Sequence, residues 1–278
     1  MPRGSANEGL TSELARICGP EFVRPAGAAD AVAGVTAAWV AAPGTVDGVA
    51  TLLRLAADRD LAVVPRGAGT KLDWGAPPTR LDLVLDTGRL AGVWHHAPAE
   101  GWAEVGAGTP VRAVQATLAR AGRRLALDPA STDATLGGVV ATDEAGPLRH
   151  RHGSACEQLV GLSYVRAGGV LTHADIAESP ALWSVAEAAP MRAAADVAEG
   201  AIGDETSPPD ARLLCGSYGA LGVVVSAIVN THPVPPAAVW VLRSVWTPLE
   251  VHDLVEELLL SPIRPAAVEV DLPAAPSQ

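Results

Sequence analysis

The sequence has 278 residues and a formal net charge of −11 at pH 7, and 49% of its residues are hydrophobic. A chain of this length can bury a sizeable core, in one large domain or two modest ones. The acidic balance argues against nucleic acid as a partner, because phosphate contacts need clustered Arg and Lys. No apolar run reaches the roughly 20 residues that cross a bilayer, and the first ten residues lack the apolar segment of a secretory signal. We therefore expect a soluble, cytoplasmic protein without a membrane span.

The three cysteines, Cys18, Cys156 and Cys215, are scattered along the chain and have no CxxC spacing. An odd number at such separations favours neither a disulfide framework nor a zinc site, and we expect no bound metal. The chain also lacks a cysteine cluster that could hold an iron–sulfur centre of its own.

Strand and helix alternate in the first part of the chain. Residues 36–43, 61–65 and 81–86 are short apolar runs typical of buried strands. Between the first two, residues 45–60 have the apolar spacing of a helix, with Thr45 as its N-cap. A strand–helix–strand order with apolar strands predicts a parallel sheet.

The pattern then changes to one typical of antiparallel strands. Residues 92–108 and 159–173 are expected hairpins, 109–122 an expected helix, and 221–235 a long strand closed by prolines. We interpret residues 174–212, which are rich in Ala, Asp, Glu and Pro, as a surface insertion.

A last strand–helix–strand unit is expected at residues 238–246, 248–261 and 266–273. One such unit cannot make a core of its own. It is therefore interpreted as the start of a second domain.

The only lysine in the chain, Lys71, lies in the glycine-rich stretch VVPRGAGTKLDWG at residues 63–75. Glycines after a buried strand allow successive backbone N–H groups to point at one anion, which is typical of phosphate binding. The stretch is not a Walker A motif, because Lys71 follows the threonine instead of preceding it. It lacks the third glycine of the dinucleotide fingerprint, since position 72 is leucine, and the second GAGT at 106–109 fails because position 111 is valine. An ordinary turn is the alternative.

Five blocks decide between these interpretations: PRGAGTKLDWG, LVLDTGRLAGV, EVGAGTPVRAVQATLARAGRRLALDP, ATLGGVVATDEAGPLRHRHGS and GSYGALGVVVSAIVNTHPVP. In this order they resemble the FAD-binding domain of the vanillyl-alcohol-oxidase/p-cresol-methylhydroxylase (PCMH-type) flavoproteins. The likeness is strongest to the FAD-linked glycolate oxidase subunit and the bacterial D-lactate dehydrogenases. It covers residues 36–235, with a weaker similarity out to position 273.

The resemblance implies an α+β fold of two α+β subdomains. The first holds a small, mainly parallel sheet and the second a mainly antiparallel sheet with helices, and a truncated βαβ cap follows. The chain then divides into an N-terminal segment (1–35), the FAD-binding domain (36–236, with the insertion at 174–212) and the remnant of a substrate domain (237–278).

The resemblance also implies the residues that bind FAD. In the family, a P-x-G-x-G-[ST] loop wraps the pyrophosphate, and Lys71 is inferred to offset its charge, with a solvated loop cation as the alternative. Members with a covalent flavin carry a histidine in this loop, which this chain lacks, so noncovalent FAD is expected. The implied set is Pro65, Arg66, Gly67, Ala68, Gly69, Thr70, Lys71, Asp128, Pro129, Thr135, Gly137, Gly138, Thr142 and Val224.

Three departures from the family bear on catalysis. The K-N-x-x-G-Y-D block is absent, Cys156 and Glu157 stand where Arg and Asp are common, and the cap is short. Oxidation of a 2-hydroxy acid needs a base for the hydroxyl proton and a cation for the carboxylate. The weak candidates for catalysis are His150 and His152 in PLRHRHGS, which would share one side if that stretch were extended; an exposed basic loop is the alternative.

We therefore expect an FAD-dependent oxidoreductase subunit that oxidises a small 2-hydroxy acid such as glycolate or D-lactate. The short cap suggests a partner chain, an iron–sulfur subunit or a second flavin subunit. The alternatives are a degenerate flavin-binding protein without activity and a scaffold that has lost FAD.

Overall fold

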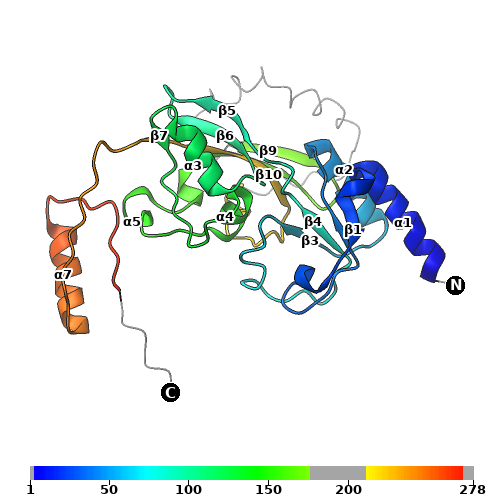
Figure 1. Cartoon of the computed structure of the whole chain (residues 1–278), viewed down its shortest axis with the longest axis horizontal. Coiled ribbons are helices and arrows are strands. Elements are labelled where there is room, and N and C mark those ends of the chain that lie inside the picture. Colours follow the sequence, from blue (N-terminus) through cyan, green and yellow to red (C-terminus); the bar gives the residue numbers. More distant parts are fainter. Residues whose placement is uncertain (1–2, 176–210, 272–278) are drawn as a thin grey trace.

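The computed structural model describes residues 3–175 and 211–271 of the chain (Figure 1). Two larger sheets form its body, a third sheet has only the two strands β7 and β11, and helices α1 and α2 lie at the end where the chain begins. The first subdomain comprises α1 (Arg3–Cys18), η1 (Pro20–Phe22), β1 (Val23–Pro25), η2 (Ala28–Asp30), β2 (Trp39–Ala41), α2 (Val46–Asp58), β3 (Val63–Arg66) and β4 (Leu83–Asp86).

The first sheet has the strand order β1-β2-β4-β3, and its last three strands run parallel. Helix α2 begins where the sequence predicts, because Thr45 Oγ1 accepts a hydrogen bond from the Gly48 amide at 3.0 Å. Its apolar face, which includes Val49 and Leu52, is buried against the sheets. The predicted parallel strand–helix–strand unit is confirmed. It directs the end of β3 and the loop after it towards the second subdomain.

The second subdomain is built on a five-stranded antiparallel sheet of order β5-β6-β10-β8-β9. The two predicted hairpins are β5–β6 and β8–β9, and the predicted long strand is the central strand β10. The elements are β5 (Val93–Ala97), β6 (Trp102–Gly106), α3 (Val111–Ala119), β7 (Arg123–Arg124), α4 (Leu136–Thr142), α5 (Arg149–His152), η3 (Cys156–Gln158), β8 (Leu159–Val165), β9 (Leu171–Asp175), η5 (Ala211–Leu213), β10 (Val223–Asn230) and β11 (His232–Pro233).

Apolar clusters cover both faces of this sheet. On one face, side chains of β6, β8 and β10 pack with those of α3 and α4, including Val114, Leu118 and Leu136. On the other, Val165 and Val225 share a core with α2 and the parallel sheet. Because both faces are covered, β8 is buried along its whole length. The predicted α+β fold with two unlike sheets is confirmed.

The end of the chain differs from the prediction. Helix α7 (Pro248–Leu260) forms as expected, but residues 238–246 and the described part of 266–273 are not strands. These residues extend away from the two sheets (Figure 1), and no strand of the described part of the chain lies beside them to supply the backbone hydrogen bonds that a strand needs. Trp240 and Trp246 are accordingly 75% and 86% exposed. Most of the predicted insertion at 174–212 lies outside the described residues.

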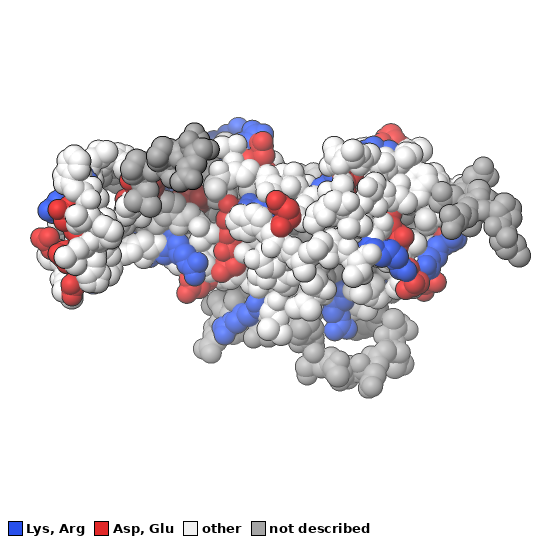
Figure 2. Space-filling view, turned by 90° about the horizontal axis from the view of Figure 1, so that it is seen from below, with Lys and Arg blue, Asp and Glu red and all other residues white. Residues whose placement is uncertain are grey.

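Charged side chains do not gather by sign on the face shown in Figure 2, where basic and acidic residues are interspersed with uncharged ones. Within the two described ranges, no helix has both the length and the apolar character needed to cross a membrane.

Candidate cofactor-binding site

A cavity of about 380 Å³ lies where the two subdomains meet. Residues of three segments, 64–72, 135–142 and 217–224, provide most of its lining. The first is the end of β3 with the glycine-rich loop, the second is α4 with its N-cap, and the third leads into β10. The cavity thus lies at the carboxyl end of a parallel strand, where α/β sheets commonly bind ligands.

The structure brings most of the residues predicted to bind FAD around this one cavity. The lining includes Pro65, Arg66, Gly67, Ala68, Gly69, Thr70, Lys71, Thr135, Gly137, Gly138, Thr142 and Val224. Asp128 and Pro129 do not line it. Instead, Asp128 Oδ2 accepts a hydrogen bond from the Leu148 amide at 3.0 Å, which holds the loop before α5. A direct role of each of these residues in FAD binding stays a prediction.

Close approach of backbone segments shapes the cavity. A Cβ on Gly67 would overlap Oγ1 of Thr135, the N-cap residue of α4. Gly219 and Pro65 both line the cavity, and a Cβ on Gly219 would come 2.7 Å from Pro65 Cγ. Gly69 has a φ of 77°, a conformation that glycine adopts without steric cost. The loop therefore depends on glycine both for its contact with α4 and for its curl.

Two ion pairs hold Arg66, the last residue of β3, beside the glycine-rich loop. Its Nη1 lies 2.7 Å from Asp30 Oδ1, and its Nη2 lies 2.8 Å from Asp86 Oδ2. Arg24 binds both oxygens of Asp30, and this hydrogen bonding holds the pKa of the Asp30 carboxyl well below its usual range. Sequence reasoning missed Asp30, which lies in the segment before the first matching block and carries no motif. The network fixes the position at which the glycine-rich loop leaves β3.

Lys71 is not a solvated loop cation. Its side chain is 7% exposed and forms an ion pair with Glu144, whose side chain is 5% exposed. The Lys71 Nζ also lies 3.2 Å from Thr70 Oγ1 and 5.6 Å from the centre of the Trp74 ring. No sequence signal marked Glu144 as its partner, because the pair joins two loops far apart in the chain.

His150 and His152 are not brought to the cavity. They lie on α5, a single helical turn, so the extended arrangement that would align their rings is not formed. The His152 ring packs instead against His232 of β11, with ring centres 4.5 Å apart. Burial and the neighbouring Arg124 lower the pKa of His152.

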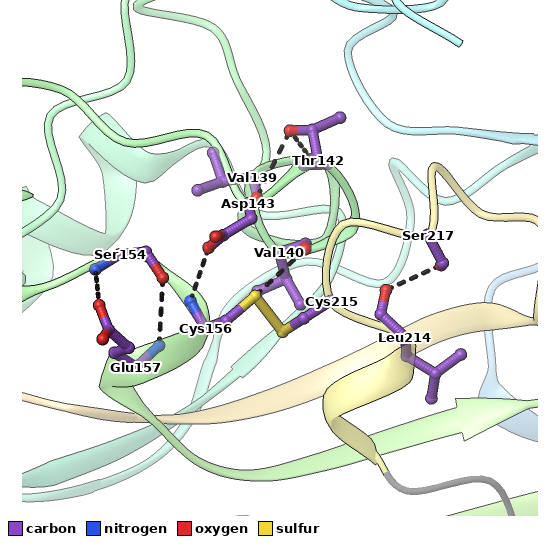
Figure 3. The surroundings of a disulfide bond; sticks show 11 residues. Val139, Val140, Thr142, Asp143, Ser154, Cys156, Glu157, Leu214, Cys215 and Ser217 are labelled. Atoms are coloured by element: carbon purple, nitrogen blue, oxygen red, sulfur yellow. Dashed lines mark hydrogen bonds between the residues drawn. A yellow bond between two sulfur atoms is a disulfide. The ribbon is translucent and has the colours of Figure 1, made fainter. Parts of the chain in front are cut away.

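The expectation of no disulfide is wrong. Cys156 and Cys215 are bonded, with their Cα atoms 5.8 Å apart (Figure 3). The Cys156 amide donates to Asp143 Oδ1 at 3.0 Å, just beyond α4. The bond fixes the start of the segment that includes Ser217 and the rest of the third cavity wall. Sequence spacing could not reveal it, because the two cysteines are 59 positions apart.

Comparison with known proteins defines the class that this fold and site represent. Residues 37–175 match the FAD binding domain family, so the chain belongs to that family and FAD is its cofactor. The predicted likeness is confirmed as well, because the curated relatives of the chain include glycolate oxidase subunits GlcE and GlcD and a D-lactate dehydrogenase.

Among curated relatives, D-2-hydroxyglutarate dehydrogenase of Xanthomonas citri pv. viticola is 30% identical over 206 residues, 73% of this chain and 39% of the relative. Glycolate oxidase subunit GlcE of Escherichia coli is 28% identical over 185 residues, 66% of this chain and 46% of the relative. The chain thus spans less than half the length of either relative.

A solved structure with the same fold is that of wild-type Phl p 4.0202, a glucose dehydrogenase. It aligns with a TM-score of 0.59 at 18% identity, over 80% of this chain and 44% of the other. The agreement supports the fold alone.

Proposed function

We propose that this chain is the FAD-binding part of an oxidoreductase that oxidises a small 2-hydroxy acid such as glycolate or D-lactate. The cavity carries the proposal, because a glycine-rich loop, a helix and a strand entry that match the family's blocks surround one space. The relatives named above act, by their names, on D-2-hydroxyglutarate and glycolate. When bound, FAD would accept the hydride, and the chain would bind and orient the FAD.

We expect FAD to be held without a covalent bond. Within the described residues, the lining contains no histidine or cysteine. The glycine-rich loop offers backbone N–H groups and the Thr70 hydroxyl for the diphosphate, and Gly67 leaves room for close approach. Acid precipitation should therefore release the flavin into the supernatant.

A carboxylate or histidine that could remove the hydroxyl proton is not found in the described part of the cavity. Its lining includes no Asp, Glu or His among the residues described. This observation favours a second polypeptide that completes the site, as the name "subunit" of two relatives suggests. A partner with an iron–sulfur centre or a second flavin remains part of the proposal, and so does a cytoplasmic location. The same observation supports the alternative, a flavin-binding protein without activity of its own.

One experiment separates these possibilities. The purified chain is loaded with FAD, and its visible spectrum is recorded before and after anaerobic addition of glycolate, D-lactate or D-2-hydroxyglutarate. Loss of the oxidised flavin bands supports the oxidoreductase. Stable bands indicate a binding protein or a missing partner, and a chain that takes up no FAD contradicts the proposal.

A further inference from the structure

Both basic side chains that line the cavity are paired with carboxylates. Arg66 binds Asp30 and Asp86, and Lys71 binds Glu144. The rest of the lining, in the described ranges, is uncharged. The cavity therefore contains two cations but offers an anionic ligand little uncompensated positive charge.

Glu144 is held at both carboxylate oxygens. Its Oε2 forms the ion pair with Lys71, and its Oε1 accepts a hydrogen bond from the Ala130 amide at 3.0 Å. The residue itself is buried and lies just beyond α4, outside the lining. The carboxylate cannot rotate away without losing one of these two partners. It thereby joins the glycine-rich loop to the loop around residue 130.

The ammonium group of Lys71 is equally confined. In addition to Glu144, it contacts Thr70 Oγ1 and faces the ring of Trp74, two neighbours on its own loop. With its side chain 7% exposed, little water is available to replace a lost partner. Without its counter-charge, a buried group of this kind is left uncompensated and gains more from binding another anion.

We propose that Glu144 sets the charge of the diphosphate-binding loop. By binding Lys71 it cancels the ammonium charge, so FAD is held mainly by neutral backbone and hydroxyl donors. The inference rests on the proposed FAD site and adds to it a determinant of how strongly anions bind. It implies that FAD binding depends little on salt, because salt screens uncompensated charges.

The test compares FAD dissociation constants, from quenching of flavin fluorescence, at 50 and 500 mM NaCl. The wild-type constant should change by less than about twofold between these concentrations. The variant Glu144→Gln keeps the size of the side chain and frees the charge of Lys71. It should bind FAD about fivefold more tightly at 50 mM NaCl and lose that gain at 500 mM.

Two further probes separate charge from structure. The double variant Lys71→Met/Glu144→Gln removes both charges and should restore the weak salt dependence of the wild type. ADP, which carries the diphosphate without the flavin, should compete for the site more effectively in Glu144→Gln than in the wild type. A residue with a merely structural role would not change the salt dependence.

The inference is overturned if Glu144→Gln weakens FAD binding equally at both salt concentrations, or leaves the salt dependence unchanged. If Glu144→Gln does not fold, the swapped variant Lys71→Glu/Glu144→Lys decides. If this variant binds FAD with the affinity and salt dependence of the wild type, the inference is supported. A steep salt dependence would refute the inference. A wild-type chain that binds no FAD refutes the proposed function itself, an outcome distinct from these.

Discussion

Gly67 of the glycine-rich loop lies directly against Thr135, the N-cap residue of α4, with no room for a side chain between them. This contact joins the subdomain of the parallel sheet to that of the antiparallel sheet at the wall of the cavity. The site therefore depends on two segments that are far apart in the sequence and touch through backbone and hydroxyl atoms.

Substitution of Gly67 tests this contact. We expect Gly67→Ala to destabilise the fold by about 1–3 kcal/mol, because the new Cβ overlaps Thr135 Oγ1 and forces the loop outwards. FAD affinity should fall at least tenfold, measured by fluorescence titration alongside thermal unfolding. The double variant Gly67→Ala/Thr135→Ala removes the overlapping hydroxyl and should recover part of the loss. Gly168→Ala is the control, since a Cβ there meets nothing within 4 Å; equal effects at both glycines would contradict the explanation.

The network around Asp30 predicts a pH effect on stability. The pKa of Asp30 is lower in the folded state than in the unfolded state. Its contribution to the free energy of unfolding is therefore fully present above the unfolded-state pKa of about 4, and it is lost as the pH falls from there towards the folded-state pKa. Asp30→Asn should cost about 3 kcal/mol at pH 7, because it leaves Arg66 short of a buried partner. Urea unfolding from pH 7 to pH 3 should show a shallower decline in this variant than in the wild type. Asp133→Asn, in an exposed pair with Arg112, should behave as the wild type does.

Glu104 should make the protein less stable as the pH rises, the opposite of the pH dependence expected for Asp30. Burial raises the pKa of this carboxyl, although Ser226 Oγ donates a hydrogen bond to it at 3.0 Å. Since the folded state favours the protonated form, its contribution to stability falls as the pH rises above the unfolded pKa. Glu104→Gln keeps the hydrogen bond and removes the titration, so its melting temperature should exceed that of the wild type by a margin that grows from pH 5 to pH 8. The exposed Glu100→Gln provides the comparison, and a margin that does not vary with pH would count against this account.

Reduction of the Cys156–Cys215 disulfide should loosen the third wall of the cavity. For a closed loop of this size we expect a loss of about 4 kcal/mol in unfolding free energy, measured in urea with and without a phosphine reductant. FAD affinity should weaken as well, because the bond fixes the segment that leads to Ser217. Cys156→Ser/Cys215→Ser should match the reduced wild type and be insensitive to reductant. A wild-type chain whose stability is unchanged by reduction would show that the bond contributes nothing.

Local sequence patterns predicted much of the fold and of the site. The helix at Val46–Asp58 follows from its apolar spacing and the Thr45 cap, and the parallel strands follow from their apolar runs. The glycine-rich loop is recognisable because its chemistry is contained in a few consecutive residues. The ordered blocks then indicated which distant segments would surround the cavity with it.

Pairings between distant side chains were decided by the tertiary structure alone. The partners Lys71–Glu144, Arg66–Asp30 and Cys156–Cys215 each join segments whose spacing in the chain carries no periodic signal. The predicted strand at 238–246 failed for a related reason, since β propensity becomes a strand only where a neighbouring backbone supplies hydrogen bonds. Local sequence determines which conformations are favourable for a segment, whereas the identity of its partners depends on how the whole chain packs.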